Sequence, residues 1–425
     1  MGKSACMSVV ALCLCLLAGS VLAANPAAGK DPGVFVSPYA KWQNGPPKDA
    51  NYFPIATWLQ PAKYGKQLQE AGVNLVIGIW NGPDEKALAD FKALGMPVIC
   101  AQNEVALKHK DDPIIVGWIY KDEPDNAQPV AGFWKNDEAA IRKAWPEANR
   151  TLAQWGTYGP PVPPKDIIAE YQKIVAADPT RPVYMNLGQG VAYNNYNGRG
   201  YRRYKSEDYP EYIKGCDIVS FDLYAYTFPN PEVKGKIWLV PFGVDNLRKW
   251  SGGRKVVWNF VETTQVYKDA NKPPPGIVNA EVWMSIIHGS QGITYYAHGQ
   301  GSDGGDSENA LVSDKEMMAA LKDINAQVKA LAPVINSPTV EGGAVAQATA
   351  PDAVVDCIAK KHGGATYVFA VGMRPIKTAA KFTVKGLPDA KVEVIGEKRS
   401  LDAKAGAFED TFGPYEVHLY KITNP

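Results

Sequence analysis

The middle of the chain alternates short apolar, β-branched runs with amphipathic segments. Such regular alternation predicts a parallel sheet in which each strand is followed by a helix. Eight runs have strand character, and this number predicts a (β/α)8 TIM barrel. The predicted strands are 52–58, 73–80, 97–102, 114–121, 182–187, 217–224, 255–261 and 292–296.

Glycine and proline mark the ends of the helices between these strands. Gly72 and Gly95 follow amphipathic segments, and Pro83 precedes the second one. The predicted helices are 61–71, 84–94, 166–177, 209–214, 241–250, 279–288 and 315–331. A segment rich in Pro, Trp and Gly, 125–165, is expected to be an insertion after the fourth strand. The alternative is an open doubly wound sheet, but the sequence has no glycine-rich phosphate loop after an early strand.

Beyond Pro338 the pattern changes to alternation with a period of two. The runs with this period are 367–371, 381–385, 391–395 and 416–420, separated by turn residues. They predict a small antiparallel β-sandwich over 338–425, after a barrel over 34–337. We expect this module to pack against one flank of the barrel.

The first 23 residues have the pattern of a secretory signal peptide. Lys3 supplies the positive charge, 9–17 are apolar, and 21–23 form a cleavage site of small residues. No later apolar run is long enough to cross a bilayer. The sequence therefore predicts a secreted or periplasmic protein with no membrane span.

Composition and charge narrow the choice of partner. The net charge of +1 disfavours binding to nucleic acid or to an anionic membrane. The five histidines are scattered and no HExxH or CxxC is present, so no metal site and no cofactor is expected. Cys100, Cys216 and Cys357 remain after the signal peptide, and their apolar neighbours predict buried free thiols. The 11 tryptophans and 21 tyrosines are more than usual, as suits a protein that stacks on sugar rings.

Two carboxylates stand at the C-terminal ends of predicted strands. Asp122-Glu123-Pro124 closes the fourth strand, and Glu262 closes the seventh. Active sites of such barrels lie at this end. A retaining sugar hydrolase needs one carboxylic acid to protonate the leaving oxygen and a second carboxylate, about 5–5.5 Å away, to attack the anomeric carbon. We expect Glu123 and Glu262 to face each other across one pocket, with the proline holding the backbone of Glu123 extended.

With these residues the chain resembles the retaining glycoside hydrolases of clan A, over the barrel and at the closing hairpin 408–420. Those barrels carry an Asn-Glu-Pro acid/base after strand four and a nucleophile after strand seven. The resemblance implies that Glu123 is the general acid/base and Glu262 the nucleophile, without assigning a family. Asp122 departs from the pattern, because it stands where the clan has asparagine. It would raise the proton affinity of Glu123 if ionised, or be the proton donor itself.

Other polar and aromatic residues follow the predicted strands and are candidates for substrate binding. For each of them, packing at the barrel rim or a structural hydrogen bond is the alternative. The candidates are Asp122, Trp80, Asn186, Asp222, Tyr224, Tyr226, Tyr296 and His298.

The loop 193–205, after strand five, interleaves tyrosines with arginines. It is either a solvated loop or a subsite wall in which tyrosines stack on sugars and an arginine pairs with an acidic sugar.

Together these patterns predict an exported retaining glycoside hydrolase that cleaves a β-glycosidic bond in an oligo- or polysaccharide. Two alternatives remain open: a catalytically inactive carbohydrate-binding barrel, and an adhesive protein that uses the barrel as a scaffold.

Overall fold

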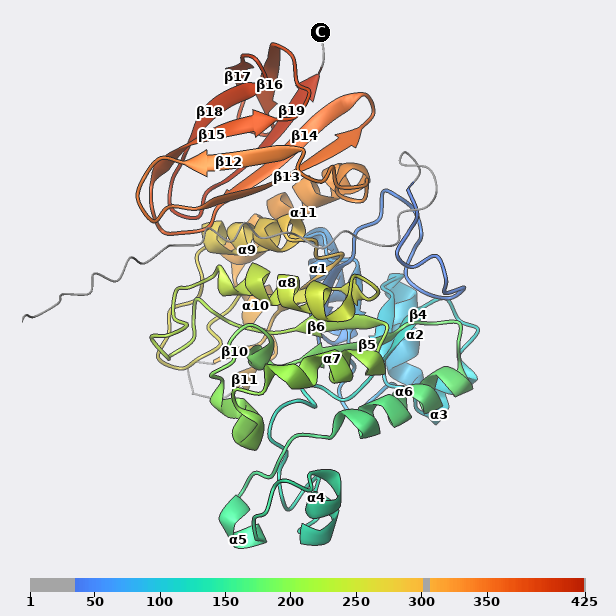
Figure 1. The fold of residues 1–425 in the computed structure, drawn as a ribbon. Helices are drawn as coiled ribbons and strands as arrows, with labels where there is room; N and C mark the ends of the chain where they lie inside the picture. Colours follow the sequence, from blue (N-terminus) through green and yellow to red (C-terminus); the bar gives the residue numbers. More distant parts are fainter. Residues whose placement is uncertain (1–34, 301–305, 424–425) are drawn as a thin grey trace, which may run out of the picture.

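A computed structural model describes residues 35–300 and 306–423 (Figure 1), so the predicted signal peptide lies outside the described residues. The barrel sheet is parallel, with strand order β7-β6-β5-β4-β3-β2-β1-β9-β8. Its strands are β1 (Ile55–Trp58), β2 (Leu75–Ile77), β3 (Val98–Cys100), β4 (Ile115–Ile119), β5 (Val183–Leu187), β6 (Ile218–Phe221), β7 (Val256–Val257), β8 (Asn259–Glu262) and β9 (Ile293–Tyr296).

The seventh predicted strand is divided into two segments. β7 pairs with β6, β8 pairs with β9, and only Trp258 separates β7 from β8. The two segments therefore connect opposite ends of the sheet and nearly close the barrel. The fold class predicted from the sequence is confirmed, although the single strand expected over 255–261 is interrupted at Trp258 and extends to Glu262.

Helices alternate with the strands, as the apolar pattern predicts. Those around the barrel are α1 (Gly65–Glu70), α2 (Glu85–Leu94), α3 (Glu104–Lys108), α6 (Pro164–Ala177), α7 (Tyr209–Tyr212), α8 (Leu239–Ser251), α9 (Pro275–Ile287), α10 (Ala310–Ser313) and α11 (Lys315–Ile335). The capping residues of α2 explain where this helix begins and ends. Asp84 accepts a hydrogen bond from the amide of Ala87 at the start, and Gly95 ends the helix in the left-handed conformation. The helix expected over 61–71 is instead a 3-10 turn, Ala62–Tyr64, followed by α1.

The insertion after β4 has a small core of its own. It contains α4 (Glu138–Ala144) and α5 (Leu152–Trp155), which project from the end of the molecule opposite the β-sandwich (Figure 1). Trp134, Trp145 and Trp155 are buried there together with Ile141. Among the described residues, no helix is both long enough and apolar enough to cross a bilayer.

The C-terminal module consists of two antiparallel sheets, with orders β12-β15-β18 and β13-β14-β19-β16-β17. The strands are β12 (Ala344–Ala348), β13 (Val355–His362), β14 (Ala365–Gly372), β15 (Thr378–Val384), β16 (Ala390–Val394), β17 (Arg399–Ala403), β18 (Ala407–Phe412) and β19 (Val417–Thr423). The four strands predicted from the sequence correspond to β14, β15, β16 and β19. The module lies over α9 and α11 (Figure 1), and Trp283 of α9 packs edge-to-face on Phe369 of β14 at 5.2 Å.

We predict that Gly292→Ala destabilises the barrel by about 1–3 kcal/mol. A Cβ at Gly292 would lie 2.6–2.7 Å from the indole of the fully buried Trp258, which cannot move without disturbing the interior. Denaturant unfolding measures the loss. Gly276→Ala in α9 is the matched control, because its Cβ meets nothing within 4 Å. Equal stability of the two variants would contradict this view of the interior.

Candidate active site

A cavity of about 630 Å³ opens at the C-terminal ends of the barrel strands. Its walls are largely aromatic, with several polar side chains between the rings. The aromatic residues are Trp58, Trp80, Tyr196, Tyr224, Phe260, Tyr267 and Tyr296. The polar side chains include Asp122, Glu123, Asn186, Gln189, Asp222 and His298. A cleft with this mixture of aromatic faces and converging polar groups is suited to a small polar ligand such as a sugar.

Three carboxyl groups meet in this cavity. Asp122 and Glu123 follow β4, and Asp222 follows β6. Asn186 of β5 lies between them and donates through Nδ2 to Asp122 Oδ1 at 3.0 Å and to Asp222 Oδ1 at 3.3 Å. The carboxyl groups of Glu123 and Asp222 are themselves hydrogen-bonded. Because two ionised carboxylates cannot share a hydrogen bond, one of this pair holds a proton.

The pKa shifts of the two groups indicate that Glu123 holds this proton. Burial raises the pKa of Glu123 well above its usual range, and the charges of Asp222 and Asp122 raise it further. Burial also raises the pKa of Asp222, but only to about 6, because its carboxylate accepts hydrogen bonds from Glu123, Tyr224 and Asn186. Glu123 is therefore the acid of the pair and Asp222 the carboxylate. Asp122 lies at the exposed edge of the cavity, where desolvation of its carboxyl group and the charge of Asp222 raise its pKa to about 7.

The backbone at Glu123 differs from the prediction. Its φ is +41°, in the left-handed region, whereas Pro124 was expected to hold it extended. The amide of Glu123 donates to the carbonyl of Asn186 at 3.1 Å, and its carbonyl accepts from Asn126 at 3.1 Å, so the chain turns sharply here. Leu59 and Asn81, which also line the cavity, have φ of +50° and +61°. Unfavourable backbone conformations gathered at one cavity are typical of a functional site.

Glu262 does not line this cavity. It is fully buried at the end of β8, and its carboxylate accepts from the amide of Tyr226 at 2.5 Å and from the amide and hydroxyl of Thr227 at 3.1 and 2.6 Å. Burial raises its pKa to about 7, against the effect of these bonds. The expected arrangement, in which Glu262 faces Glu123 across a pocket, is absent from the structure, because Glu262 anchors the loop after β6.

Tyr226 likewise does not line the cavity, and its amide is one of the donors to Glu262. Glu281 of α9, also fully buried, lies near Glu262, whose charge together with burial raises the pKa of Glu281 well above its usual range. The loop after β6 is thus held from behind by Glu262, next to which Glu281 is buried.

The other predicted candidates all line the cavity. Half of Trp80 is exposed (52%) at the mouth, and its ring packs edge-to-face on His298 at 5.7 Å. Tyr224 and Tyr296 form a tilted aromatic pair, 4.6 Å between centroids. His298 is buried, with Nε2 3.3 Å from the carbonyl of Trp58. These residues are Trp80, Asp122, Asn186, Asp222, Tyr224, Tyr296 and His298.

Sequence reasoning missed several lining residues, among them Gln189, Tyr267 and Tyr196. Gln189 follows β5 and donates to the hydroxyl of Tyr267 at 2.9 Å. Tyr196 belongs to the loop 193–205, whose run of tyrosines was the one signal for it. This loop is neither simply solvated nor the full subsite wall that was considered. Tyr196 lines the cavity, whereas Arg199 is buried in internal ion pairs.

Two amide oxygens beside the carboxyl groups have no donor among the described residues. They are Asn186 Oδ1 and Gln189 Oε1, both buried in the cavity wall. Each is free to accept a hydrogen bond from a hydroxyl group of a ligand. In the part of the chain that the structure describes, no group of three or more His, Cys, Asp or Glu side chains is arranged to hold a metal ion.

The fold of this chain is shared by solved structures of other proteins, although their sequences differ widely from it. No family model and no curated protein matches the chain. Among solved structures, Gan42B, a GH42 β-galactosidase, has a TM-score of 0.53 at 9% identity, over 90% of this chain and 100% of that chain. A catalytic mutant of Gan42B from G. stearothermophilus has a TM-score of 0.52 at 10% identity, over 91% and 100%.

The fold that this chain shares with them is a TIM barrel followed by β-sheets. Another structure, an α-amylase from Geobacillus thermoleovorans with acarbose, has a TM-score of 0.49 at 11% identity, over 90% of this chain and 99% of that chain. At these identities the likeness concerns the architecture of the barrel alone.

We predict that Asp122→Asn makes the fold more stable at neutral pH, although by less than the full pKa shift implies, because Asp122 is partly exposed to solvent. The pKa of Asp122 is about 7 in the folded protein, and about 3.9 is expected in the unfolded chain. Between these values the unfolded chain releases a proton that the folded protein keeps, so the free energy of unfolding falls as pH rises.

The gain from Asp122→Asn is therefore near zero at pH 4, grows towards pH 7 and then levels off. Urea unfolding over this range measures it, with Asp323→Asn on the exposed side of α11 as the control. A gain that is largest at pH 4 would contradict the raised pKa.

Proposed function

We propose that this protein is an exported retaining glycoside hydrolase acting on a β-linked oligo- or polysaccharide, with Glu123 as general acid/base and Asp222 as nucleophile. The observation that carries the proposal is the contact between Glu123 and Asp222 in an aromatic cavity, where the pKa of Glu123 is raised well above its usual range. Glycosidic cleavage needs one carboxyl that keeps its proton and one that stays ionised.

The closeness of the two groups favours retention of configuration. An inverting enzyme places a water molecule between its carboxyls, which stand about 6.5–9.5 Å apart. Hydrogen-bonded carboxyls such as those of Glu123 and Asp222 leave no room for that water. In a double displacement, Glu123 protonates the leaving oxygen while Asp222 bonds to the anomeric carbon, and Glu123 then activates the water that hydrolyses the intermediate.

Asp222 replaces Glu262 in the role of nucleophile because of where each carboxylate lies. Asp222 lines the cavity, and donors from Asn186 and Tyr224 keep it ionised. Glu262 is fully buried behind the loop after β6, with its oxygens turned to Tyr226 and Thr227. Its contribution is to hold that loop, and with it the segment that begins at Asp222.

The walls of the cavity suit a sugar ring. Trp80, Tyr224 and Tyr296 offer flat aromatic faces, and Asn186 Oδ1 and Gln189 Oε1 offer unused acceptors for hydroxyl groups. The solved structures with TM-scores above 0.5 are of a β-galactosidase, which supports a β-glycosidic substrate. Export is proposed from the N-terminal sequence alone.

We predict that Glu123→Gln lowers kcat on a natural glycan by about 10²–10⁴-fold. Asp222→Asn is expected to lose at least as much, because no covalent intermediate forms. Glu262→Gln, the matched carboxylate outside the cavity, should lose at most about ten-fold, the effect of one weakened hydrogen bond. Steady-state kinetics on a panel of β-linked glycans and aryl glycosides measures these differences. A larger loss in Glu262→Gln than in Asp222→Asn would reverse the assignment.

Azide separates the two roles by the product that forms. With an activated aryl β-glycoside, Glu123→Ala should recover turnover in azide and give a β-glycosyl azide, whereas Asp222→Gly should give the α-anomer. NMR of the product distinguishes them. If only Asp122→Ala responds to azide, Asp122 is the donor. Glycan binding without hydrolysis by the unaltered protein would favour the inactive binding barrel.

A further inference from the structure

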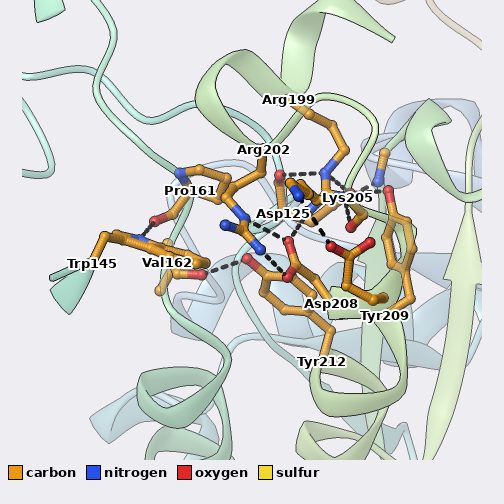
Figure 2. Close-up of polar contacts among 12 residues, drawn as sticks. Asp125, Trp145, Pro161, Val162, Arg199, Arg202, Lys205, Asp208, Tyr209 and Tyr212 are labelled. Carbon is orange, nitrogen blue, oxygen red and sulfur yellow. Dashed lines mark hydrogen bonds and ion pairs between the residues drawn. The ribbon is translucent and has the colours of Figure 1, made fainter. Parts of the chain in front are cut away.

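A buried cluster of charges joins the segment that follows Glu123 to the loop after β5 (Figure 2). Arg199, from the loop after β5, is fully buried, with 0% of its side chain exposed. Its Nε donates to the carbonyl of Asp125 at 3.2 Å, one Nη to the carbonyl of Lys205 at 2.8 Å, and the other Nη to Asp208 Oδ2 at 2.9 Å. Its guanidinium also lies over the ring of Tyr209 at 4.6 Å.

Asp125 is the acidic centre of this cluster and is also fully buried. Its Oδ1 accepts from the amide of Gly188 at 2.9 Å, and its Oδ2 accepts from the hydroxyl of Tyr209 at 3.0 Å. Arg199 Nε lies 4.0 Å from the same Oδ2. Burying two charges is costly unless hydrogen bonds and ion pairs compensate for the lost water. A buried ion pair with this many partners therefore points to a functional role rather than to a gain in stability.

The position of Asp125 in the chain suggests that role. Asp125 lies two residues after Glu123, and Gly188 lies two residues after Asn186. The bond from Gly188 to Asp125 therefore ties the segment that carries the acid to the segment that orients both aspartates. The next residue, Gln189, also lines the cavity.

The loop is shaped to admit this cluster. A Cβ on Gly190 would lie 2.2 Å from the hydroxyl of Tyr209 and 2.5 Å from Arg199 Cδ, so only glycine fits. On the outer side, Arg202 makes a bidentate pair with Asp208 at 2.9 and 2.6 Å and lies over the ring of Trp145 in the insertion (Figure 2). The cluster thus connects three separate segments of chain behind one wall of the cavity.

We propose that Asp125 and Arg199 are positioning residues of the active site, which hold Glu123 opposite Asp222 by joining the segments after β4 and β5. This inference rests on the proposed function. Neither side chain lines the cavity, so each acts through the backbone that it holds and through its charge.

The cluster also affects the carboxyl groups of the cavity through the charge of Asp125. The carboxylate of Asp125 contributes to raising the pKa of Glu123, Asp122 and Asp222. Burial raises the pKa of Asp125 itself, and Arg199, the Gly188 amide and the Tyr209 hydroxyl oppose that shift. The other titratable groups around the cluster are Asp208 and Tyr212, both of which face Arg199. Asp125→Asn should therefore lower the pKa of Glu123.

The chain offers a matched control at the opposite end of β5. Asp178 and Arg181 form a second buried pair, 2.8 Å apart, with side chains 4% and 1% exposed. Neither lines the cavity. Asp178→Asn and Asp125→Asn thus remove the same charge from similar surroundings, and only one of them lies behind the proposed catalytic pair.

Kinetics of the full-length variants tests the proposal. Asp125→Asn should lose about ten-fold or more in kcat with little change in KM, since misplaced catalytic groups slow the chemical step. The basic limb of its pH profile should also move to lower pH. Asp178→Asn should lose stability but keep kcat and the pH profile. Tyr209→Phe is a milder variant should Asp125→Asn fail to fold. It removes a hydrogen bond that lowers the pKa of Asp125, so Asp125 is uncharged more often and the profile should shift in the same direction. Unchanged profiles in Asp125→Asn and Tyr209→Phe would overturn the proposal.

A titration without substrate separates this proposal from the proposed function. NMR of protein labelled with ¹³C at glutamate carboxyls, assigned with Glu123→Gln, follows the proton on Glu123 directly. A lower pKa of Glu123 in Asp125→Asn or Tyr209→Phe, but not in Asp178→Asn, supports the positioning role even if the unaltered protein hydrolyses no glycan. An unchanged pKa in all three variants overturns it even if the enzyme is active.

Discussion

Three carboxyl groups within reach of one another cannot all be ionised without strong mutual repulsion. Asp222 is buried and Glu123 half-buried in a cavity with aromatic walls, and Asp122 lies at its exposed edge. The group with the fewest donors keeps its proton, and in this structure that group is Glu123. The division of labour between an acid and a carboxylate thus follows from burial and from the placement of a few donors.

The rest of the fold serves to hold these groups in place. Asn186 joins the two aspartates from β5, and a left-handed turn at Glu123 directs its side chain inward against local preference. Behind the cavity, Asp125 and Arg199 fix one wall, while Glu262 fixes the loop that begins at Asp222. Buried charges of this kind lower stability or contribute little to it, so those that hold the segments around the cavity indicate a functional constraint.

The architecture could be predicted from the sequence because the alternation of strands and helices is a local property. The break at Trp258 could not be predicted, since it depends on how β7 and β8 pair with different neighbours. In the sandwich, β12 and β17 have half-exposed positions and mixed residues, so their period of two was too weak to detect.

At the site, Glu123 after the fourth strand lines the cavity, whereas Glu262 after the seventh does not. A sequence cannot show that Tyr226 and Thr227 occupy the oxygens of Glu262. Asp222 was expected only to bind hydroxyl groups, because its contact with Glu123 joins residues far apart in the chain. Asp125 and Arg199 gave no sequence signal of a shared role, because their contact depends on how two loops fold together.

The most direct test of the carboxyl pair is to trap the covalent intermediate. A 2-deoxy-2-fluoroglycoside with a good leaving group slows the second step, and mass spectrometry of peptides from the trapped protein locates the sugar. The account predicts an ester at Asp222 in the unaltered protein. A label on Glu262, or on any residue other than Asp222, would contradict it.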